Sequence, residues 1–406
     1  MTQAADILVP ARASETRLVG GVCLAHLVSH YYMLMLAPLF LFIKADYGVS
    51  YTELSLALIV FNVVSAVLQT PVGFLADRIG ARVTLIGGLL IGSGAVAVAG
   101  LAEAFWMFIA MFAVLGLANT VYHPSDYALL SERVAPRRLT QVFSFHTCAG
   151  MIGSAVAPVS LLFMEGMIGW RGAFLCAAAF GVGAALILAL QAEMPVHRVA
   201  PAAPPRGAEA GSADGWRLLL SPPILLNLVF FVVLSMVGGG LNQYLVVGLG
   251  ALYGTPAALA NTALTGLLAM SAIGVLAGGA LAARTGHHNV VACAGLIVTG
   301  SAATFIGFFD PGALLLVLVT SLSGFASGIA MPSRDMIVRS VTPPGSVGKV
   351  FGFVTTGFHI GGMVAPLIFA QFLDHGMPRA VFLYVAACAL VAVGTVAFGM
   401  ADRRTA

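Results

Sequence analysis

The sequence predicts an all-α membrane protein with twelve transmembrane helices in two parallel six-helix repeats. Of its 406 residues, 60% are apolar and only 9% are charged, whereas a soluble domain usually carries about 25% charged residues. So few charges could not cover the surface of a water-soluble enzyme of this size. The apolar segments are long and continuous, unlike the roughly ten-residue alternating strands of a membrane barrel. The two halves of the chain also repeat each other.

Twelve apolar runs are long enough to cross a bilayer, whose hydrocarbon core requires about 20 residues per helix. Turn signals and charges separate each run from the next. The predicted spans, numbered 1 to 12 along the chain, are residues 18–43, 52–76, 83–101, 105–131, 139–164, 172–192, 222–247, 259–283, 290–309, 312–341, 349–373 and 380–399.

The positions of the basic residues orient these spans. If the N-terminus is cytoplasmic, 16 of the 19 Lys and Arg residues fall on the cytoplasmic side. Only Lys44, Arg171 and Arg379 fall on the opposite side. Because cytoplasmic loops carry an excess of Lys and Arg, we expect both termini in the cytoplasm. The expected location is a bacterial inner membrane, with the protein as a multi-pass monomer.

Residues 193–216 form the longest polar stretch and are rich in Pro, Ala and Gly. This composition is typical of a flexible linker. It divides the chain into an N-terminal six-helix bundle, residues 1–192, and a C-terminal six-helix bundle, residues 217–406.

The second bundle repeats the first at an offset of about 208 residues. This offset aligns Pro124-Ser125 with Pro332-Ser333 and Ala157-Pro158 with Ala365-Pro366. Six spans return the chain to its starting side, so both repeats have the same orientation. Two parallel repeats predict a central site between the halves, which would open to each face in turn as one half rocks against the other.

The loop after span 2 carries the strongest motif, Gly73-Phe-Leu-Ala-Asp77-Arg78-Ile-Gly80-Ala-Arg82. It resembles the signature loop of the major facilitator superfamily, and the resemblance implies that superfamily's transporter fold. The second copy is degenerate, since Ala283 replaces the Asp and His287-His288 replaces the basic pair.

The resemblance also implies a conformational latch formed by Gly73, Asp77, Arg78, Gly80 and Arg82. By that resemblance, Asp77 would meet the start of span 11 near Ser346–Lys349, where an acid can stabilise a helix N-terminus. The alternative is a basic loop that only sets the topology.

A narrower resemblance rests on three short segments, in spans 1, 2 and 4. They are Ala25-His26-Leu27, Leu68-Gln69-Thr70-Pro71-Val72-Gly73 and Tyr122-His123-Pro124. They look like segments of the fosmidomycin-resistance-type branch of drug exporters. Ala25 stands where that branch has Ser, and the residues after the His-Pro pair differ, which leaves the substrate open.

Span 5 is similar to the antiporter signature of the superfamily. It has Gly150, Gly153 and Ala157-Pro158, but Val159-Ser160 stands in place of the final Gly pair. Small residues permit close helix contact and Pro bends a helix. Ordinary packing therefore explains this segment as well as antiport does.

Polar groups inside a bilayer are costly, so they are candidates for function. They gather mainly on spans that the resemblance places around the cavity or along its sides. The candidate substrate-binding or proton-coupling residues are His26, His30, Tyr31, Gln69, Asn119, Tyr122, His123, Asp126, His146, Asn242, Gln243, Tyr244, Ser333 and His359.

Histidine side chains can exchange a proton near physiological pH. Asp126 could do so too if burial makes its ionised form less stable. We therefore expect His30, His123 or Asp126 to carry a coupling proton, the alternative for each being a satisfied hydrogen bond between helices. Charges near the cytoplasmic helix ends, such as Arg334 and Asp335, are expected to act in gating or topology rather than as substrate ligands.

The predicted function is secondary active transport by alternating access. The leading hypothesis is proton-coupled export of a small drug-like or metabolic compound. One alternative is proton-coupled uptake of an organic acid or vitamin, and another is a membrane sensor that no longer transports. No sequence spacing indicates an enzyme nucleophile, a metal site, a cofactor or nucleic-acid binding. The expected partners are a small-molecule substrate, protons and the lipid bilayer.

Overall fold

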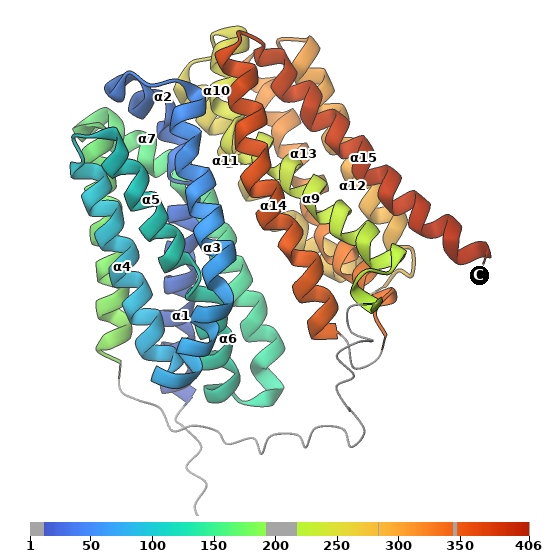
Figure 1. The fold of residues 1–406 in the computed structure, drawn as a ribbon, viewed down its shortest axis with the longest axis horizontal. Helices are drawn as coiled ribbons and strands as arrows, with labels where there is room; N and C mark the ends of the chain where they lie inside the picture. The colour runs from blue at the N-terminus through green and yellow to red at the C-terminus, as the bar shows by residue number, and fades with distance from the viewer. Residues whose placement is uncertain (1–11, 192–216, 283, 344–346, 406) are drawn as a thin grey trace, which may run out of the picture.

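The computed structural model describes residues 12–191, 217–282, 284–343 and 347–405, and every regular element in these residues is an α-helix (Figure 1). The predicted linker, residues 193–216, lies outside the described residues.

The first set of helices precedes the linker. It consists of α1 (Arg12–Leu34), α2 (Leu36–Tyr47), α3 (Tyr51–Ile79), α4 (Ala81–Leu101), α5 (Phe105–Asn119), α6 (Tyr122–Arg133) and α7 (Pro136–Ala189).

The second set follows the linker. It consists of α9 (Pro222–Gln243), α10 (Leu245–Tyr253), α11 (Ala257–Ala282), α12 (His288–Phe308), α13 (Gly312–Ser340), α14 (Val347–Asp374) and α15 (Pro378–Thr405).

Spans 1 and 4 were expected as continuous helices, but each is broken. Helices α1 and α2 meet at an angle of 41° at Met35, and α5 passes to α6 through Thr120 and Val121. Each break lies three to four residues before a proline, Pro38 or Pro124. Proline has no N–H for the carbonyl four residues earlier and its ring clashes with that carbonyl, so the regular helix ends there.

Spans 5 and 6 join in the opposite way. Helix α7 contains 54 residues, about 80 Å at 1.5 Å per residue, which is too long for one crossing of a bilayer. Gly169 divides it, because its φ of 72° is non-helical and is readily adopted only by glycine. Span 7 is α9 followed by α10, with the break at Tyr244. The described helices thus account for all twelve predicted spans.

Close helix contacts repeat between the two sets. Gly116 faces the backbone of Phe61, and Gly324 faces the backbone of Leu267 in the same way. A Cβ at Gly116 would lie 2.5 Å from the Phe61 carbonyl oxygen, so a larger residue would push the two helices apart. Small residues let helix backbones approach closely in a membrane, where burial of apolar surface gives little driving force. The internal sequence repeat therefore extends to helix packing.

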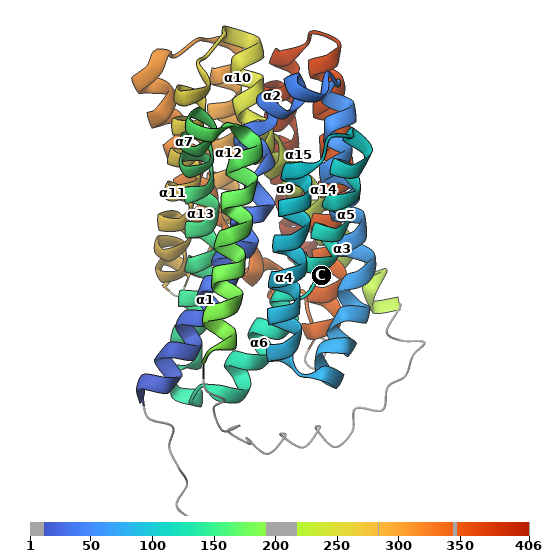
Figure 2. The ribbon, with the colours of Figure 1, turned by 90° about the vertical axis from the view of Figure 1, so that its left-hand side faces the viewer.

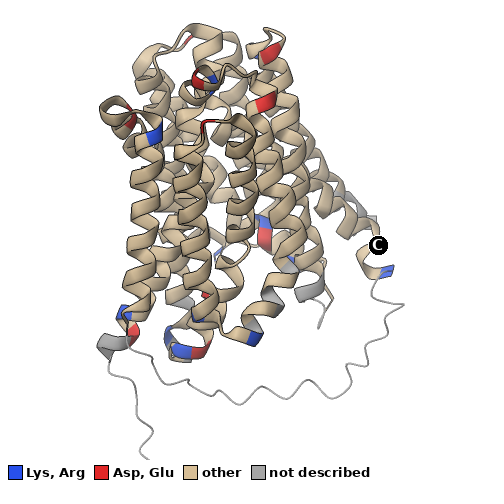
Figure 3. Ribbon diagram, turned by 60° about the vertical axis from the view of Figure 1, so that its left-hand side comes forward, with Lys and Arg blue, Asp and Glu red and all other residues tan. Residues whose placement is uncertain are grey.

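The two sets stand side by side and touch along part of their length (Figures 1 and 2). Helix α3 packs on α14, α7 packs on α11, and α2 contacts α9 and α10. We call the end at which α1 begins and α7 stops the linker end, and the opposite end the far end. Figure 3 shows Lys and Arg mainly at the linker end and few charges along the middle of the helices.

The far end is closed by hydrogen bonds between the sets. The Asp374 carboxylate, at the end of α14, accepts hydrogen bonds of 2.8 Å from the backbone N–H groups of both Tyr51 and Thr52. Gln371 donates another, of 3.0 Å, to the Thr52 hydroxyl. The first N–H groups of a helix have no partner within the helix. Asp374 supplies that partner for α3 from the other half of the protein.

Tyr244 adds a second contact to this closure. It is fully buried, and its hydroxyl lies 2.5 Å from the Ser55 hydroxyl and donates to the Pro366 carbonyl at 3.0 Å. We call the contacts of Tyr51, Thr52 and Ser55 with Tyr244, Gln371 and Asp374 the far-end closure.

Asp374→Ala is expected to weaken the far-end closure. The substitution removes both charged hydrogen bonds to the start of α3. Because these bonds are partly exposed to solvent, together they stabilise the closed far end by about 1 kcal/mol, which corresponds to roughly a fivefold shift in the ratio of closed to open molecules. The measurement is double electron–electron resonance between spin labels at Glu103 and Asp310, in a chain without its native cysteines. A larger fraction of molecules should show the long distance expected when the far end is open.

Asp46→Ala is the matched control, because Asp46 forms its far-end ion pair with Arg171 inside one set of helices. It should leave the distance distribution as in the parent chain. An unchanged distribution in Asp374→Ala would contradict the role assigned to Asp374.

Candidate functional site

Helices α1, α6 and α7 bring five ionisable side chains together inside the first set. His26 and His30 lie four residues apart on one face of α1, as the helical period requires. His123 and Asp126 lie three apart on α6, and His146 comes from the first part of α7. We call these five residues the histidine–aspartate cluster.

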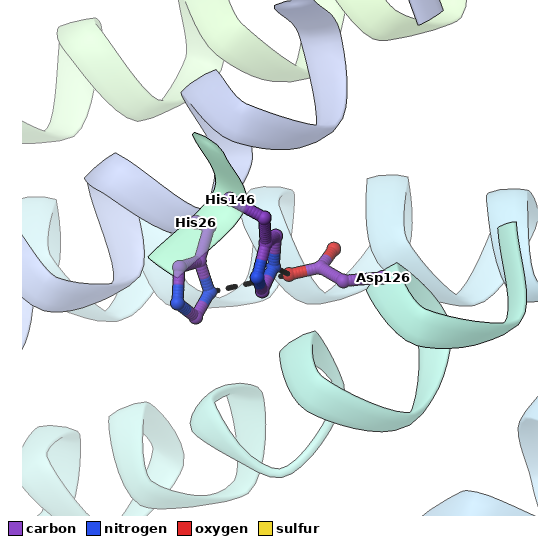
Figure 4. Close-up of side chains that lie close together, drawn as sticks. All are labelled: His26, Asp126 and His146. Atoms are coloured by element: carbon purple, nitrogen blue, oxygen red, sulfur yellow. Dashed lines mark hydrogen bonds and ion pairs between the residues drawn. The ribbon is translucent and has the colours of Figure 1, made fainter. Parts of the chain in front are cut away.

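Asp126 meets two of the histidines, His26 and His146, in the buried part of the cluster (Figure 4). Its Oδ2 atom lies 2.9 Å from Nε2 of His146 and 3.3 Å from Nδ1 of His26. The two imidazole rings stack, with their centroids 3.7 Å apart. Asp126 is 0% exposed, His146 1% and His26 3%. One carboxylate oxygen therefore lies close to two imidazole nitrogens, and only that of His146 is hydrogen-bonded to it.

This core can hold a proton in more than one place. The 2.9 Å distance is a hydrogen-bond length, so an N–H of His146 can donate to the carboxylate. The Oδ1 atom of Asp126 and Nδ1 of His146 have no hydrogen-bond partner among the described residues. The ligand atoms of His26, Asp126 and His146 also lie within 4.8 Å of one another, close enough for a metal ion. Sequence spacing alone did not indicate that grouping.

The other two histidines extend the cluster from its buried core. The ring centroids of His30 and His123 lie 4.7 Å and 5.2 Å from that of His26. His30 is half-buried, with Nδ1 at 3.3 Å from the Ser154 hydroxyl, whereas His123 is exposed. The cluster thus connects an exposed imidazole with a buried carboxylate.

Sequence reasoning missed Tyr127, which is exposed beside the cluster. Its ring centroid lies 5.4 Å from that of His146 and 6.2 Å from that of His123. Its position four residues after His123 on one helix was the available signal.

Glycines of α7 make room for the cluster. A Cβ at Gly150 would lie 2.8 Å from the rings of both His26 and His30, and one at Gly153 would collide with the Leu27 carbonyl. The small residues of span 5 therefore have a packing role against α1.

Several other predicted site residues lie in the first set but outside the cluster. The Tyr31 hydroxyl lies 2.9 Å from the Ser160 hydroxyl. Tyr122 is buried, and its hydroxyl has no hydrogen-bond partner among the described residues. Asn119 is half-buried at the end of α5. In the second set, Ser333 is fully buried and its hydroxyl likewise lacks a described partner.

Five predicted residues lie at or near contacts between the two sets. Nε2 of His359 lies 3.0 Å from the side-chain oxygen of Gln69, deeper than the far-end closure. Gln243 donates a 3.3 Å hydrogen bond to the Met33 carbonyl. Tyr244 belongs to the far-end closure, and Asn242 is half-buried beside it in sequence.

The predicted latch is described only in part. Gly73 lies in α3, but the side chain of Asp77 and its expected contact with residues 346–349 lie outside what the structure describes. Gly80 separates α3 from α4 with a φ of 96°, and Arg78 is exposed.

Arg82 has an observed role at the linker end. Its guanidinium donates to the carbonyls of Leu188, Ala189 and Gln191. A cation at the C-terminus of a helix satisfies free carbonyls and complements the helix dipole. Arg82 therefore ties α4 to the end of α7, within one set of helices.

A family model described as Major Facilitator Superfamily matches residues 22–260 and 244–405. The chain belongs to the major facilitator superfamily. It is therefore a multi-pass membrane transporter and not an enzyme, as the resemblance predicted.

Curated relatives include both exporters and transporters of organic acids. The chain is 20% identical over 387 residues to the fosmidomycin resistance protein of Escherichia coli, covering 91% of each. It is 26% identical over 371 residues to an MFS-type efflux pump of Mycolicibacterium smegmatis, covering 85% of this chain and 82% of the pump. A probable L-galactonate transporter of Escherichia coli is 29% identical over 140 residues, which span 34% of this chain and only 31% of that transporter.

Solved structures of low identity share the fold. A bacterial homologue of the human lysosomal transporter Spinster, inward-facing and unoccupied, superposes with a TM-score of 0.81 at 14% identity, covering 96% of this chain and 97% of that one. The nucleoside transporter NupG gives 0.76 at 13% identity, covering 95% and 99%.

Gly153→Ala is expected to destabilise the protein and to disturb the cluster. The added methyl group must displace the backbone of α1 at Leu27, and overpacking of this kind costs about 1–3 kcal/mol. The measurement is the thermal unfolding midpoint of the purified chain, which should fall by several degrees.

Gly166→Ala provides the matched control on the same helix, because a Cβ there has open space around it. Its unfolding midpoint should stay the same or rise slightly, since Ala favours the helix. Equal midpoints for the two variants would show that α1 and α7 do not pack as described.

Proposed function

We propose that this protein is a proton-coupled secondary transporter that exports a small drug-like or metabolic compound by alternating access. The observation that carries the proposal is the histidine–aspartate cluster. A carboxylate within the membrane-spanning region is costly to ionise unless it is paired, and Asp126 is paired with groups that themselves gain and lose protons.

The cluster suits proton binding and release. Asp126 is faced by His26 and Cys23 from α1, by His146 from α7, and by Tyr122, His123 and Tyr127 from its own helix. No permanently charged side chain is among these neighbours. A proton taken up at exposed His123 can therefore change the charge of the whole cluster, and a change of charge alters the free-energy cost of burying the cluster within the first half.

Alternating access is supported by the placement of the contacts between the halves. The far-end closure joins α3 to α14, and its contacts are polar and small enough to break and reform. With the linker end in the cytoplasm, as the basic residues suggest, the described arrangement is closed towards the outside. The opposite state would separate Asp374 from α3 and bring the linker ends of the two halves together.

The relatives support export but keep uptake as a second candidate. The fosmidomycin resistance protein aligns over most of the chain, and two further relatives are named as multidrug resistance proteins. Others are named as transporters of galactonate and sulfoacetate, which are organic acids. The second candidate is therefore proton-coupled uptake of a small organic acid.

Asp126→Asn is expected to uncouple transport from the proton gradient. The amide keeps the size of the side chain but cannot accept the cluster's proton as a carboxylate does. In proteoliposomes with fosmidomycin and sulfoacetate as probes, pH-driven accumulation should fall at least tenfold, whereas exchange without a gradient should stay within about threefold.

His375→Ala is the control, since His375 is exposed at the far end just after α14, and its imidazole bonds to the Gln371 carbonyl of the same half. It should accumulate the probes as the parent chain does. If Asp126→Asn retains full pH-driven accumulation, the cluster is not the coupling site.

The sign of the driving gradient separates export from uptake. An antiporter accumulates substrate in vesicles with an acidic lumen, because protons leave as substrate enters, in either orientation of the protein. A symporter accumulates substrate when the exterior is acidic. We expect an acidic lumen to drive accumulation, and accumulation driven by an acidic exterior would replace export with uptake.

A further inference from the structure

The internal repeat assigns a counterpart to Asp126. The offset of 208 residues that aligns Pro124-Ser125 with Pro332-Ser333 places Arg334 at the position of Asp126. Each half of the transporter therefore carries one charge at the same place in its fourth span, negative in the first half and positive in the second.

The side chains around the two charges also come from equivalent spans. Asp126 contacts His26 on span 1 and His146 on span 5. The guanidinium of Arg334 lies over Phe231, on span 7, and Phe358, on span 11, at 5.0 and 5.3 Å from the ring centroids. Spans 7, 10 and 11 are the repeats of spans 1, 4 and 5. The second half thus replaces the imidazoles with two aromatic rings around a permanent cation.

Arg334 is held in place but has a weakly buried counter-ion. Its side chain is 14% exposed, whereas that of its neighbour Asp335 is 49% exposed. Nε and Nη2 of Arg334 lie 2.9 and 2.8 Å from Oδ1 of Asp335. Among the described residues, Asp335 is the only acidic partner of Arg334. Its carboxylate can turn to solvent at little cost and leave the N–H groups of the guanidinium to another anion.

The N–H groups of the Arg334 guanidinium indicate which kind of ligand it can bind. Phe231 and Phe358 contact the guanidinium without providing any oxygen acceptor, and cation–π contact fixes its position. The edge of a guanidinium presents parallel N–H donors that match a carboxylate or sulfonate in a bidentate pair. Lysine would supply the charge but not this geometry.

We propose that Arg334 binds the anionic group of the transported compound, a carboxylate or a sulfonate, in exchange for Asp335. This inference rests on the proposed transport function and narrows its substrate to small organic anions. Asp126 then binds the proton in the first half, and Arg334 binds the anion in the second half. The sequence alone had assigned Arg334 to gating or topology.

The test is direct binding to the purified full-length chain, with L-galactonate and sulfoacetate as anionic probes and galactose as the neutral one. The parent chain should bind at least one anion and bind galactose at least tenfold more weakly. Arg334→Lys should weaken anion binding at least tenfold, and Arg334→Gln should abolish it. The double variant Arg334→Gln/Asp335→Asn leaves no unpaired acid and should also lack binding while keeping the unfolding midpoint.

Arg339→Gln is the matched control, because Arg339 is an exposed arginine near the end of the same helix. It should bind the anions like the parent chain. The proposal is overturned if the double variant binds within threefold of the parent chain, or if the parent chain binds neither anion.

Asp126→Asn distinguishes failure of this inference from failure of the proposed function. It should keep anion binding while losing pH-driven accumulation. Normal accumulation in Asp126→Asn together with lost binding in Arg334→Gln would reject the coupling site and keep the anion site. Lost accumulation in Asp126→Asn together with unchanged binding in Arg334→Gln would keep the coupling site and reject the anion site.

Discussion

The cost of placing a charge among apolar helices governs the design of this protein. Asp126 is fully buried, and its carboxylate is stabilised by imidazoles from two other helices. That arrangement requires α1, α6 and α7 to meet closely, which depends on glycine at positions 150 and 153. The functional site and the helix packing are therefore one problem, because the contact that brings the helices together also neutralises the buried charge.

The same constraint explains why the two halves differ at equivalent positions. Asp126 is surrounded by groups that titrate, whereas Arg334 is surrounded by Phe231 and Phe358. An imidazole can neutralise a carboxylate by giving it a proton, but an arginine stays charged and needs either aromatic faces or an anion. Aligned positions of the repeated fold thus carry charges of opposite sign, each with different side chains around it.

Contacts between the halves follow a different logic. Asp374 caps α3, and Tyr244 links Ser55 to Pro366, all at the far end. Apolar side chains also pack across the halves, as Phe40 does on Tyr244. The polar bonds involve helix ends and single hydroxyl groups. Such contacts can be exchanged for contacts with water, which suits an interface that opens and closes. Arg82, by contrast, secures α4 to α7 inside one half, where no movement is required.

The sequence by itself determined the membrane class, the twelve spans, the repeat and the superfamily, because apolar length and local motifs depend only on neighbours along the chain. Pro38 and Pro124 could also have predicted the breaks in spans 1 and 4. The sequence identified His26, Asp126 and His146 as candidates but not as one cluster, and it did not indicate that Asp374 caps α3. Only the tertiary structure decided these groupings. Asp126 follows His26 by 100 residues and His146 follows Asp126 by 20, so whether they meet depends on which helix faces pack together.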